Sequence, residues 1–209
     1  MPTTAPSTPL NPVAFAAARL FRDYVAHCTA ASPDTLFHTL TAMHSLNDRL
    51  GKASLQDFEQ FEEFLALRAL RNFAHHHDEV VANVRVIPSP AVSDLAFLCL
   101  VRRDQLERAI EITPSKWRAG IREACERKFH WYGDAININP CLFNFMVRAY
   151  EHLIANGVEV DGDAIDAFEA SYQHETDHGL PHTIDGRLTG RAGDVEDILM
   201  SLVANLPPV

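Results

Sequence analysis

The sequence predicts an all-α fold, an antiparallel helical bundle with additional helices. Apolar residues recur three and four positions apart along most of the 209 residues, which is the spacing of helices. Strand-like alternation is scarce, and Ser, Asp, Asn, Pro and Gly stand where helices would start or end. Hydrophobic residues make up 47% of the chain, enough for a sizeable core. We therefore expect one helical domain over residues 12–209.

The first three helices follow from their apolar stripes and end signals. Residues 1–11, rich in Pro, Thr and Ser, are predicted to form a disordered arm, and the first helix should begin at Pro12. A Ser-Pro-Asp string starting at Ser32 should open the second helix, which Gly51 ends. The third helix should begin at Ser54 or Asp57 and reach about Val84.

Residues 85–90 contain two prolines and predict a connection with room for a short extended piece. Beyond it we expect helices over residues 91–111, 115–132, 141–155, 161–172 and 194–206, a loop over 133–140 and an irregular Gly-rich segment over 179–193. The segment 85–135 is either an insertion into the bundle or part of it.

Charge and cysteine content restrict the function. The formal net charge of −10 argues against a protein that coats nucleic acid through bulk charge, but it leaves room for a local basic cleft. The four cysteines form no C-x-x-C pair, which argues against a zinc ribbon, and three of them lie among apolar neighbours as buried free thiols would. We expect a cytoplasmic protein without a membrane span, cofactor or bound metal.

Residues 68–78 hold the densest polar chemistry of the chain, Arg-Ala-Leu-Arg-Asn-Phe-Ala-His-His-His-Asp. On a helix, residues four apart share a face, which pairs Arg71 with His75 and Asn72 with His76. Arg68 lies seven residues before His75 and also aligns with it. A permanent cation, an amide and an imidazole on one helix could bind a phosphate and move a proton beside it.

The string from Arg71 through Asn72 to His76 resembles the R-x4–6-H motif of the HEPN superfamily. In that family the Arg is often followed by Asn, and the motif lies near the end of a bundle helix. Four residues separate Arg71 from His76 and five separate it from His77, which both fit, whereas the three before His75 do not. Arg68 and His75 also have a fitting spacing, but only Arg71 is followed by Asn. The resemblance covers about residues 33–85 and implies a HEPN-like domain.

The resemblance implies a metal-independent endoribonuclease that acts as a homodimer, with an antitoxin or other regulatory protein as a further partner. The implied context is defence, toxin activity or RNA processing. Arg71 would bind the phosphate, His76 would either remove the proton of the 2′-hydroxyl or protonate the leaving 5′-oxygen, and Asn72 would orient the imidazole. His75 is the second candidate for the proton transfer. The product would carry a cyclic 2′,3′-phosphate, and DNA would not be cut.

A path for RNA is predicted along residues 102–128. Residues 102–128 hold eight Lys or Arg residues against five Asp or Glu, the most basic region of an acidic chain. We take Arg118, Arg122 and Lys128 from this region, together with Arg68, as candidate RNA-binding residues. The alternative for this region is a solvated helix face of mixed charge.

Two other interpretations stay open. The first is a catalytically inactive HEPN-like module that binds a protein partner or a nucleotide, with the polar end of the third helix exposed to solvent. The second is a metal pair formed by His174 and His178, which lie four apart, with His182 nearby. Gly179 and Pro181 argue against a helix that continues to His182.

Overall fold

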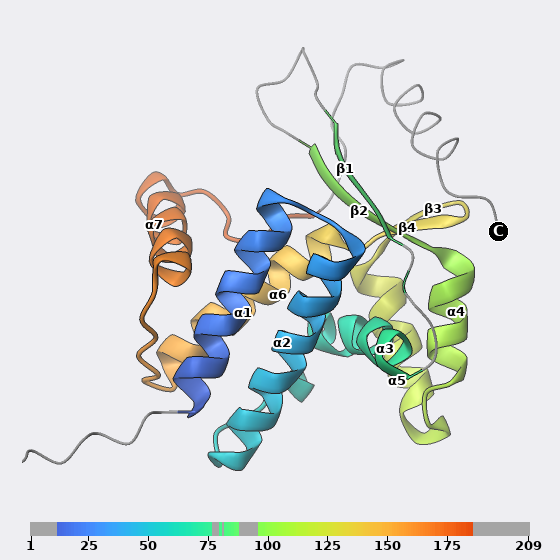
Figure 1. Ribbon diagram of the computed structural model, residues 1–209, viewed down its shortest axis with the longest axis horizontal. Helices are drawn as coiled ribbons and strands as arrows, with labels where there is room; N and C mark the ends of the chain where they lie inside the picture. The colour runs from blue at the N-terminus through green and yellow to red at the C-terminus, as the bar shows by residue number, and fades with distance from the viewer. Residues whose placement is uncertain (1–11, 77–79, 81, 88–95, 186–209) are drawn as a thin grey trace, which may run out of the picture.

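The computed structural model describes residues 12–76, 80, 82–87 and 96–185 (Figure 1). In this part of the chain the fold is mainly helical, as predicted, but it also contains a four-stranded antiparallel sheet. The predicted arm over residues 1–11 and the predicted helix over 194–206 lie outside the described residues. So does most of the irregular segment, from residue 186 on.

Helices α1 (Pro12–Thr29) and α2 (Pro33–Lys52) form a closely packed pair. The predicted cap is present, because Ser32 Oγ accepts a hydrogen bond from the Thr35 amide, and Thr35 Oγ1 accepts one from the Ser32 amide. Thr35 Oγ1 also lies 2.9 Å from Nδ1 of the buried His27. One threonine therefore joins the start of α2 to the last turn of α1.

Helix α3 spans Glu62–His76, so it begins later and ends earlier than predicted. Asp57 caps a short 3-10 helix, η1 (Phe58–Gln60), instead of opening α3. The side-chain oxygen of the buried Asn47 accepts a hydrogen bond from the Phe58 amide at 2.7 Å, which fixes this turn against α2. The predicted continuation of the helix to Val84 is wrong, because Val84 lies in a strand.

The sheet has the strand order β1-β2-β4-β3, formed by β1 (Ala82–Ile87), β2 (Ala96–Arg102), β3 (His130–Tyr132) and β4 (Ala135–Asn137). It corrects three expectations. Helix α4 (Arg103–Glu111) takes only the second half of the predicted helix 91–111, and α5 (Ser115–Lys128) ends before Tyr132. Part of the predicted loop 133–140 is strand β4. Each strand is short, and its apolar run is equally compatible with a buried helix until a partner strand is known.

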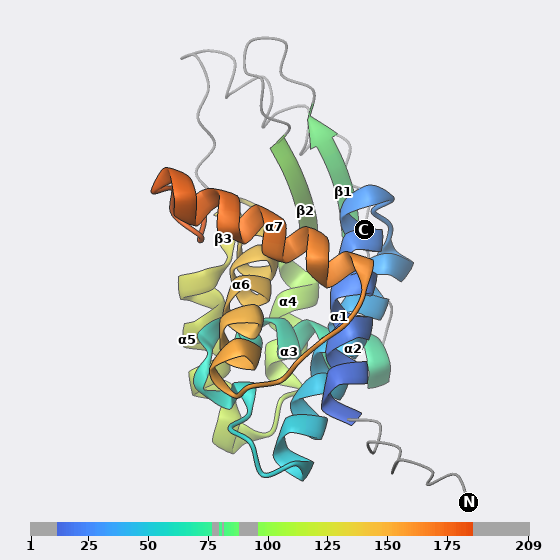
Figure 2. The ribbon, with the colours of Figure 1, turned by 90° about the vertical axis from the view of Figure 1, so that its left-hand side faces the viewer.

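Helix α6 spans Asn139–Ala155 and α7 spans Asp163–His178 (Figure 1). The predicted α7 is thus found but ends six residues later than expected, at a left-handed Gly179. Figure 2 shows α7 crossing in front of α1 and α6. Phe168 of α7 contacts Phe21 of α1 at 5.1 Å between ring centroids, which agrees with this arrangement.

The core beneath α3 is aromatic. Phe58 lies 5.9 Å from Phe64 and 5.3 Å from Phe145 of α6, measured between ring centroids, and all three side chains are fully buried. Helix α5 packs along another side of α3. The core therefore fixes which face of α3 remains accessible. Among the described helices, none combines the length and apolar character that crossing a membrane requires.

Candidate functional site

The candidate site lies on the face of α3 that points away from this core. Leu67, Leu70 and Phe73 are buried. The opposite face carries the predicted residues Arg68, Arg71, Asn72, His75 and His76, of which both histidines are exposed. These five residues span an arc of about 140° around α3 on the side away from the core, with Arg71 at one edge and His76 at the other.

Arg71 is only partly solvated. Its Nη1 donates a hydrogen bond to Asn72 Oδ1 at 3.2 Å, whereas its Nε is buried without a hydrogen-bond partner among the described residues. Burial lowers the pKa of the Arg71 guanidinium from its ordinary value, and the nearby Asp48 opposes this shift. A buried donor without a hydrogen-bond partner destabilises a structure by about 1–3 kcal/mol. A phosphate oxygen that accepted this hydrogen bond would remove that cost.

Arg71 and His76 do not point in the same direction. At about 100° per residue, they lie about 140° apart around α3, whereas Arg71 and His75 lie about 40° apart. The ring centroids of His75 and His76 are 4.6 Å apart with an interplanar angle of 79°. Within one chain His75 is therefore the histidine that shares a side of the helix with Arg71, whereas His76 shares a side with Asn72.

Helix α2 adds a histidine that the sequence interpretation did not include. His44 Nδ1 lies 3.6 Å from Asp48 Oδ2, and the His44 ring lies 6.5 Å from that of Phe64 on α3. Burial lowers the pKa of His44, and the positive charges of Arg71 and Arg68 lower it further, although Asp48 opposes them. This environment therefore favours the neutral form of the His44 imidazole. The only signal in the sequence was its i, i+4 spacing to Asp48.

The predicted RNA-binding residue Arg68 forms an ion pair with Glu59, and its guanidinium carbon lies 5.6 Å from the centroid of the Phe64 ring. Its side chain is only 14% exposed. Arg68 therefore has a carboxylate partner and an aromatic partner in its own domain, so a phosphate would have to compete with both.

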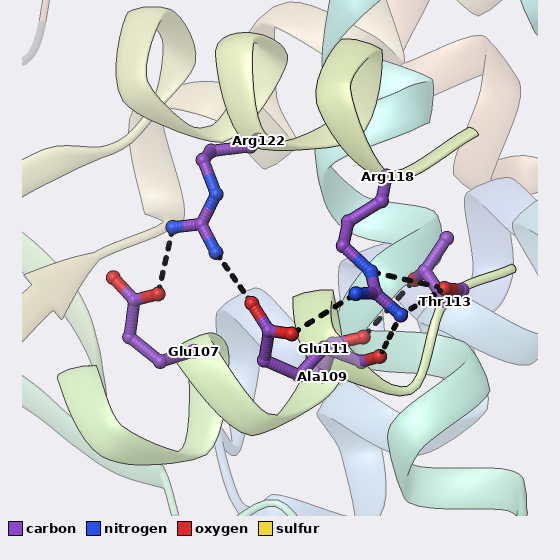
Figure 3. Close-up of polar contacts among 6 residues, drawn as sticks. All are labelled: Glu107, Ala109, Glu111, Thr113, Arg118 and Arg122. Carbon is purple, nitrogen blue, oxygen red and sulfur yellow. Dashed lines mark hydrogen bonds and ion pairs between the residues drawn. The ribbon is translucent and has the colours of Figure 1, made fainter. Parts of the chain in front are cut away.

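Two further predicted RNA-binding residues form the corner between α4 and α5 (Figure 3). Arg122 lies between Glu107 at 2.8 Å and Glu111 at 2.9 Å. Arg118 donates to the carbonyl oxygens of Glu111 and Thr113 and to the Glu111 carboxylate. Arg118 thus satisfies the carbonyl groups that the end of α4 leaves without helical partners.

Lys128, the fourth predicted RNA-binding residue, lies at the end of α5 and pairs with α3. Its Nζ is 2.9 Å from Glu63 Oε1 and 3.4 Å from Glu62 Oε2, and the Glu63 side chain is only 7% exposed. All four predicted RNA-binding cations therefore lie in ion pairs with carboxylates of the same chain. Most of the charged residues described from 102–128 thus form ion pairs within and between helices.

The histidines of α7 lie apart from this site. His174 and His178 have ring centroids 4.1 Å apart, and His182 stacks on Tyr172 at 3.7 Å and pairs with Glu175 at 2.8 Å. The described residues contain no group of three or more His, Cys, Asp or Glu side chains placed to hold a metal ion. Cys99, Cys125 and Cys141 are buried and Cys28 is exposed, and all four are free thiols.

Comparison of the chain with protein-family models, with curated proteins and with solved structures finds no match.

Proposed function

We propose that the chain is a metal-independent endoribonuclease of the HEPN type, in which Arg71, Asn72 and His76 act on RNA in a homodimer. The observation that best supports this proposal is the partly buried Arg71, whose Nε has no hydrogen-bond partner among the described residues and which lies about 40° around α3 from the exposed His75. A guanidinium in a poorly solvated setting binds a phosphate more strongly than one in open water.

The chemistry follows from these groups. A histidine removes the proton of the 2′-hydroxyl, whose oxygen attacks the adjacent phosphorus while the bond to the 5′-oxygen breaks. A second imidazole protonates the leaving 5′-oxygen. Arg71 offsets the charge that builds up on the non-bridging oxygens in the transition state. The two proton transfers need two histidines, and His75 and His76 of two copies would supply them.

A cleavage assay on a labelled single-stranded RNA, in the presence of EDTA, tests the proposal. The wild-type chain should cut the RNA and leave a cyclic 2′,3′-phosphate, and Arg71→Ala or His76→Ala should slow cleavage at least about 100-fold. His178→Ala, on the exposed surface of α7, is the matched histidine control and should cut at the wild-type rate. Intact RNA with the wild-type chain, or equal rates in all variants, would contradict the proposal.

A second function, an inactive HEPN-like module that binds a protein or a nucleotide, is favoured by one observation. The cations Arg68, Arg118, Arg122 and Lys128 are all paired with carboxylates, and the chain carries a net charge of −10. These charges are poorly suited to holding a long RNA backbone. If this function is correct, the chain should neither bind nor cut RNA at physiological salt. A nucleotide or protein that it does bind should raise the melting temperature of the chain.

A further inference from the structure

A pocket of about 300 Å³ lies between α2 and α3, beside the candidate site. Its walls come from the first two turns of α2, between Pro33 and Leu40, from Ala74 near the end of α3, and from Val80. Most of this lining is apolar. The volume is at the lower end of small-molecule sites, which span about 300–1,000 Å³, so the pocket suits a single flat ring system.

Two side chains give the pocket chemical specificity. Phe37 is half-buried and supplies an aromatic ring of the kind on which nucleobases stack. Asp34 is exposed at the rim and supplies a carboxylate, which accepts hydrogen bonds and donates none when ionised. A base that enters beside Asp34 must therefore present donors on its exposed edge.

Arg71 does not line the pocket but lies on the same helix as Ala74, which does. Residues 33–40 of α2 and Ala74 of α3 line the pocket, and farther along the same two helices the ring of His44 lies 6.5 Å from that of Phe64. One turn from Phe37 toward His44 lies Thr41, whose hydroxyl is buried without a hydrogen-bond partner among the described residues, as is Arg71 Nε. Ala74 is one turn from Arg71, about 4.5 Å along the helix axis. This separation is comparable to that between a base and its own phosphate.

We propose that this pocket binds the guanine base of a ribonucleotide whose phosphate lies at Arg71. Guanine presents two adjacent donors, N1–H and the N2 amino group, which match the two oxygens of the Asp34 carboxylate. Adenine, cytosine and uracil each place an acceptor next to the donor on that edge, and the carboxylate would repel it. The inference rests on the proposed ribonuclease and adds its specificity, namely cleavage beside guanosine.

Calorimetric titration of the full chain with nucleoside monophosphates tests the pocket. GMP should bind at least about tenfold more tightly than AMP, and IMP, which lacks the N2 amino group, should fall between them. Phe37→Ala should weaken GMP binding at least about fivefold, since stacking on an aromatic ring contributes about 1–3 kcal/mol per base. Asp34→Asn should remove the preference for GMP over AMP.

Matched controls separate the pocket from general effects. Phe15→Ala removes an exposed aromatic ring of α1, and Asp161→Asn removes an exposed carboxylate before α7, and both should bind GMP like the wild type. Arg71→Ala should weaken GMP binding to the level of guanosine and leave guanosine binding unchanged. Circular dichroism and melting temperature confirm that each variant is folded before it is titrated.

The outcomes distinguish this inference from the proposed function. If the chain cuts RNA in an Arg71-dependent manner but binds all nucleotides equally, or if Phe37→Ala and Asp34→Asn bind GMP like the wild type, the guanine pocket is wrong and the ribonuclease stands. If GMP binds with the expected dependence on Phe37 and Asp34 but RNA stays intact, the pocket stands and the ribonuclease is wrong. With both in place, mapped cleavage sites should lie beside guanosine.

Discussion

At the scale of single residues, what decides the role of a cation is whether a carboxylate already holds it. Lys128 contacts α3 and Arg71 belongs to it, but Lys128 has a carboxylate at 2.9 Å, whereas Arg71 has a buried nitrogen without a hydrogen-bond partner among the described residues. The ion pair of Lys128 can stabilise the fold, whereas the buried N–H of Arg71 can still donate a hydrogen bond to a ligand. The sequence alone does not separate these two cases.

Replacing Lys128 tests the structural role. Lys128→Met removes the ammonium group and leaves the nearly buried Glu63 carboxylate without it, so the free energy of unfolding should fall by about 1–3 kcal/mol in urea denaturation. The double variant Lys128→Met with Glu63→Gln should recover part of this loss. Lys52→Met, at the exposed end of α2, is the control. Unchanged stability together with weaker RNA binding would instead place Lys128 on an RNA path.

At the scale of secondary-structure elements, a few polar side chains join helices that apolar packing alone would leave free to slide. His27 links α1 to α2 through Thr35, and Arg118 links α5 to the end of α4. The sequence predicts that His27 and Arg118 lie on helices, but it does not predict which groups they contact. Each link can be tested by its own measurement.

The link between α1 and α2 should be sensitive to acid. Burial lowers the pKa of His27 to about 4, whereas an unfolded histidine titrates near 6.5. Between these values the unfolded chain binds more protons, so the stabilising contribution is complete above about pH 6.5 and is lost as the pH falls toward 4. The free energy of unfolding should drop by about 2 kcal/mol from pH 7.5 to pH 5 on account of this group.

Urea denaturation at several pH values measures this effect. His27→Gln cannot titrate, and its unfolding free energy should depend less on pH across this window than that of the wild type. His178→Gln, on the exposed end of α7, should retain the wild-type slope. Equal slopes for the His27 variant and the wild type would show that another group causes the acid sensitivity.

The corner of α4 and α5 should loosen when Arg118 is removed. Arg118→Ala leaves the carbonyl oxygens of Glu111 and Thr113 without their side-chain donor, so hydrogen exchange of the last turn of α4 should accelerate and the unfolding free energy should fall by about 1 kcal/mol. Arg148→Ala, which removes an exposed cation of α6, is the control. Unaltered exchange in α4 would contradict this role.

At the scale of the whole molecule, the proposed activity requires two copies. Arg71 and His76 lie about 140° apart around one helix, so a single chain does not turn both toward one phosphate. A symmetric dimer can place Arg71 of one copy opposite His76 of the other. If the site is shared in this way, two inactive variants should complement each other, which a site within one chain does not allow.

Mixing two inactive variants should restore activity. In a dimer of Arg71→Ala with His76→Ala, one of the two shared sites keeps both an intact Arg71 and an intact His76. After random exchange of subunits, the mixture should reach about a quarter of the wild-type activity, because half of the dimers are mixed and each has one intact site. Each variant alone should stay inactive. A mixture that stays inactive after exchange, shown by mass spectrometry of differently tagged chains, would rule out a shared site.

Sequence patterns predict the mainly helical character, the start of α2 with its cap, and the helix that carries Arg71, Asn72, His75 and His76. These features depend on interactions within about one turn of the chain, which spacing and capping residues report directly. The sequence did not predict the ends of α3 or the four strands. A short apolar run becomes a strand only when another strand pairs with it, and that pairing is not visible in the sequence.

Tertiary structure alone decided which polar groups are already satisfied. It brought His44 of α2 to the side of Arg71 and paired Arg68, Arg118, Arg122 and Lys128 with carboxylates of other elements. It also opened the pocket between Phe37 and Ala74, which lie 37 residues apart in the chain. These partners are distant in sequence, and the free energy of a polar side chain depends on the partner and the burial it meets after folding.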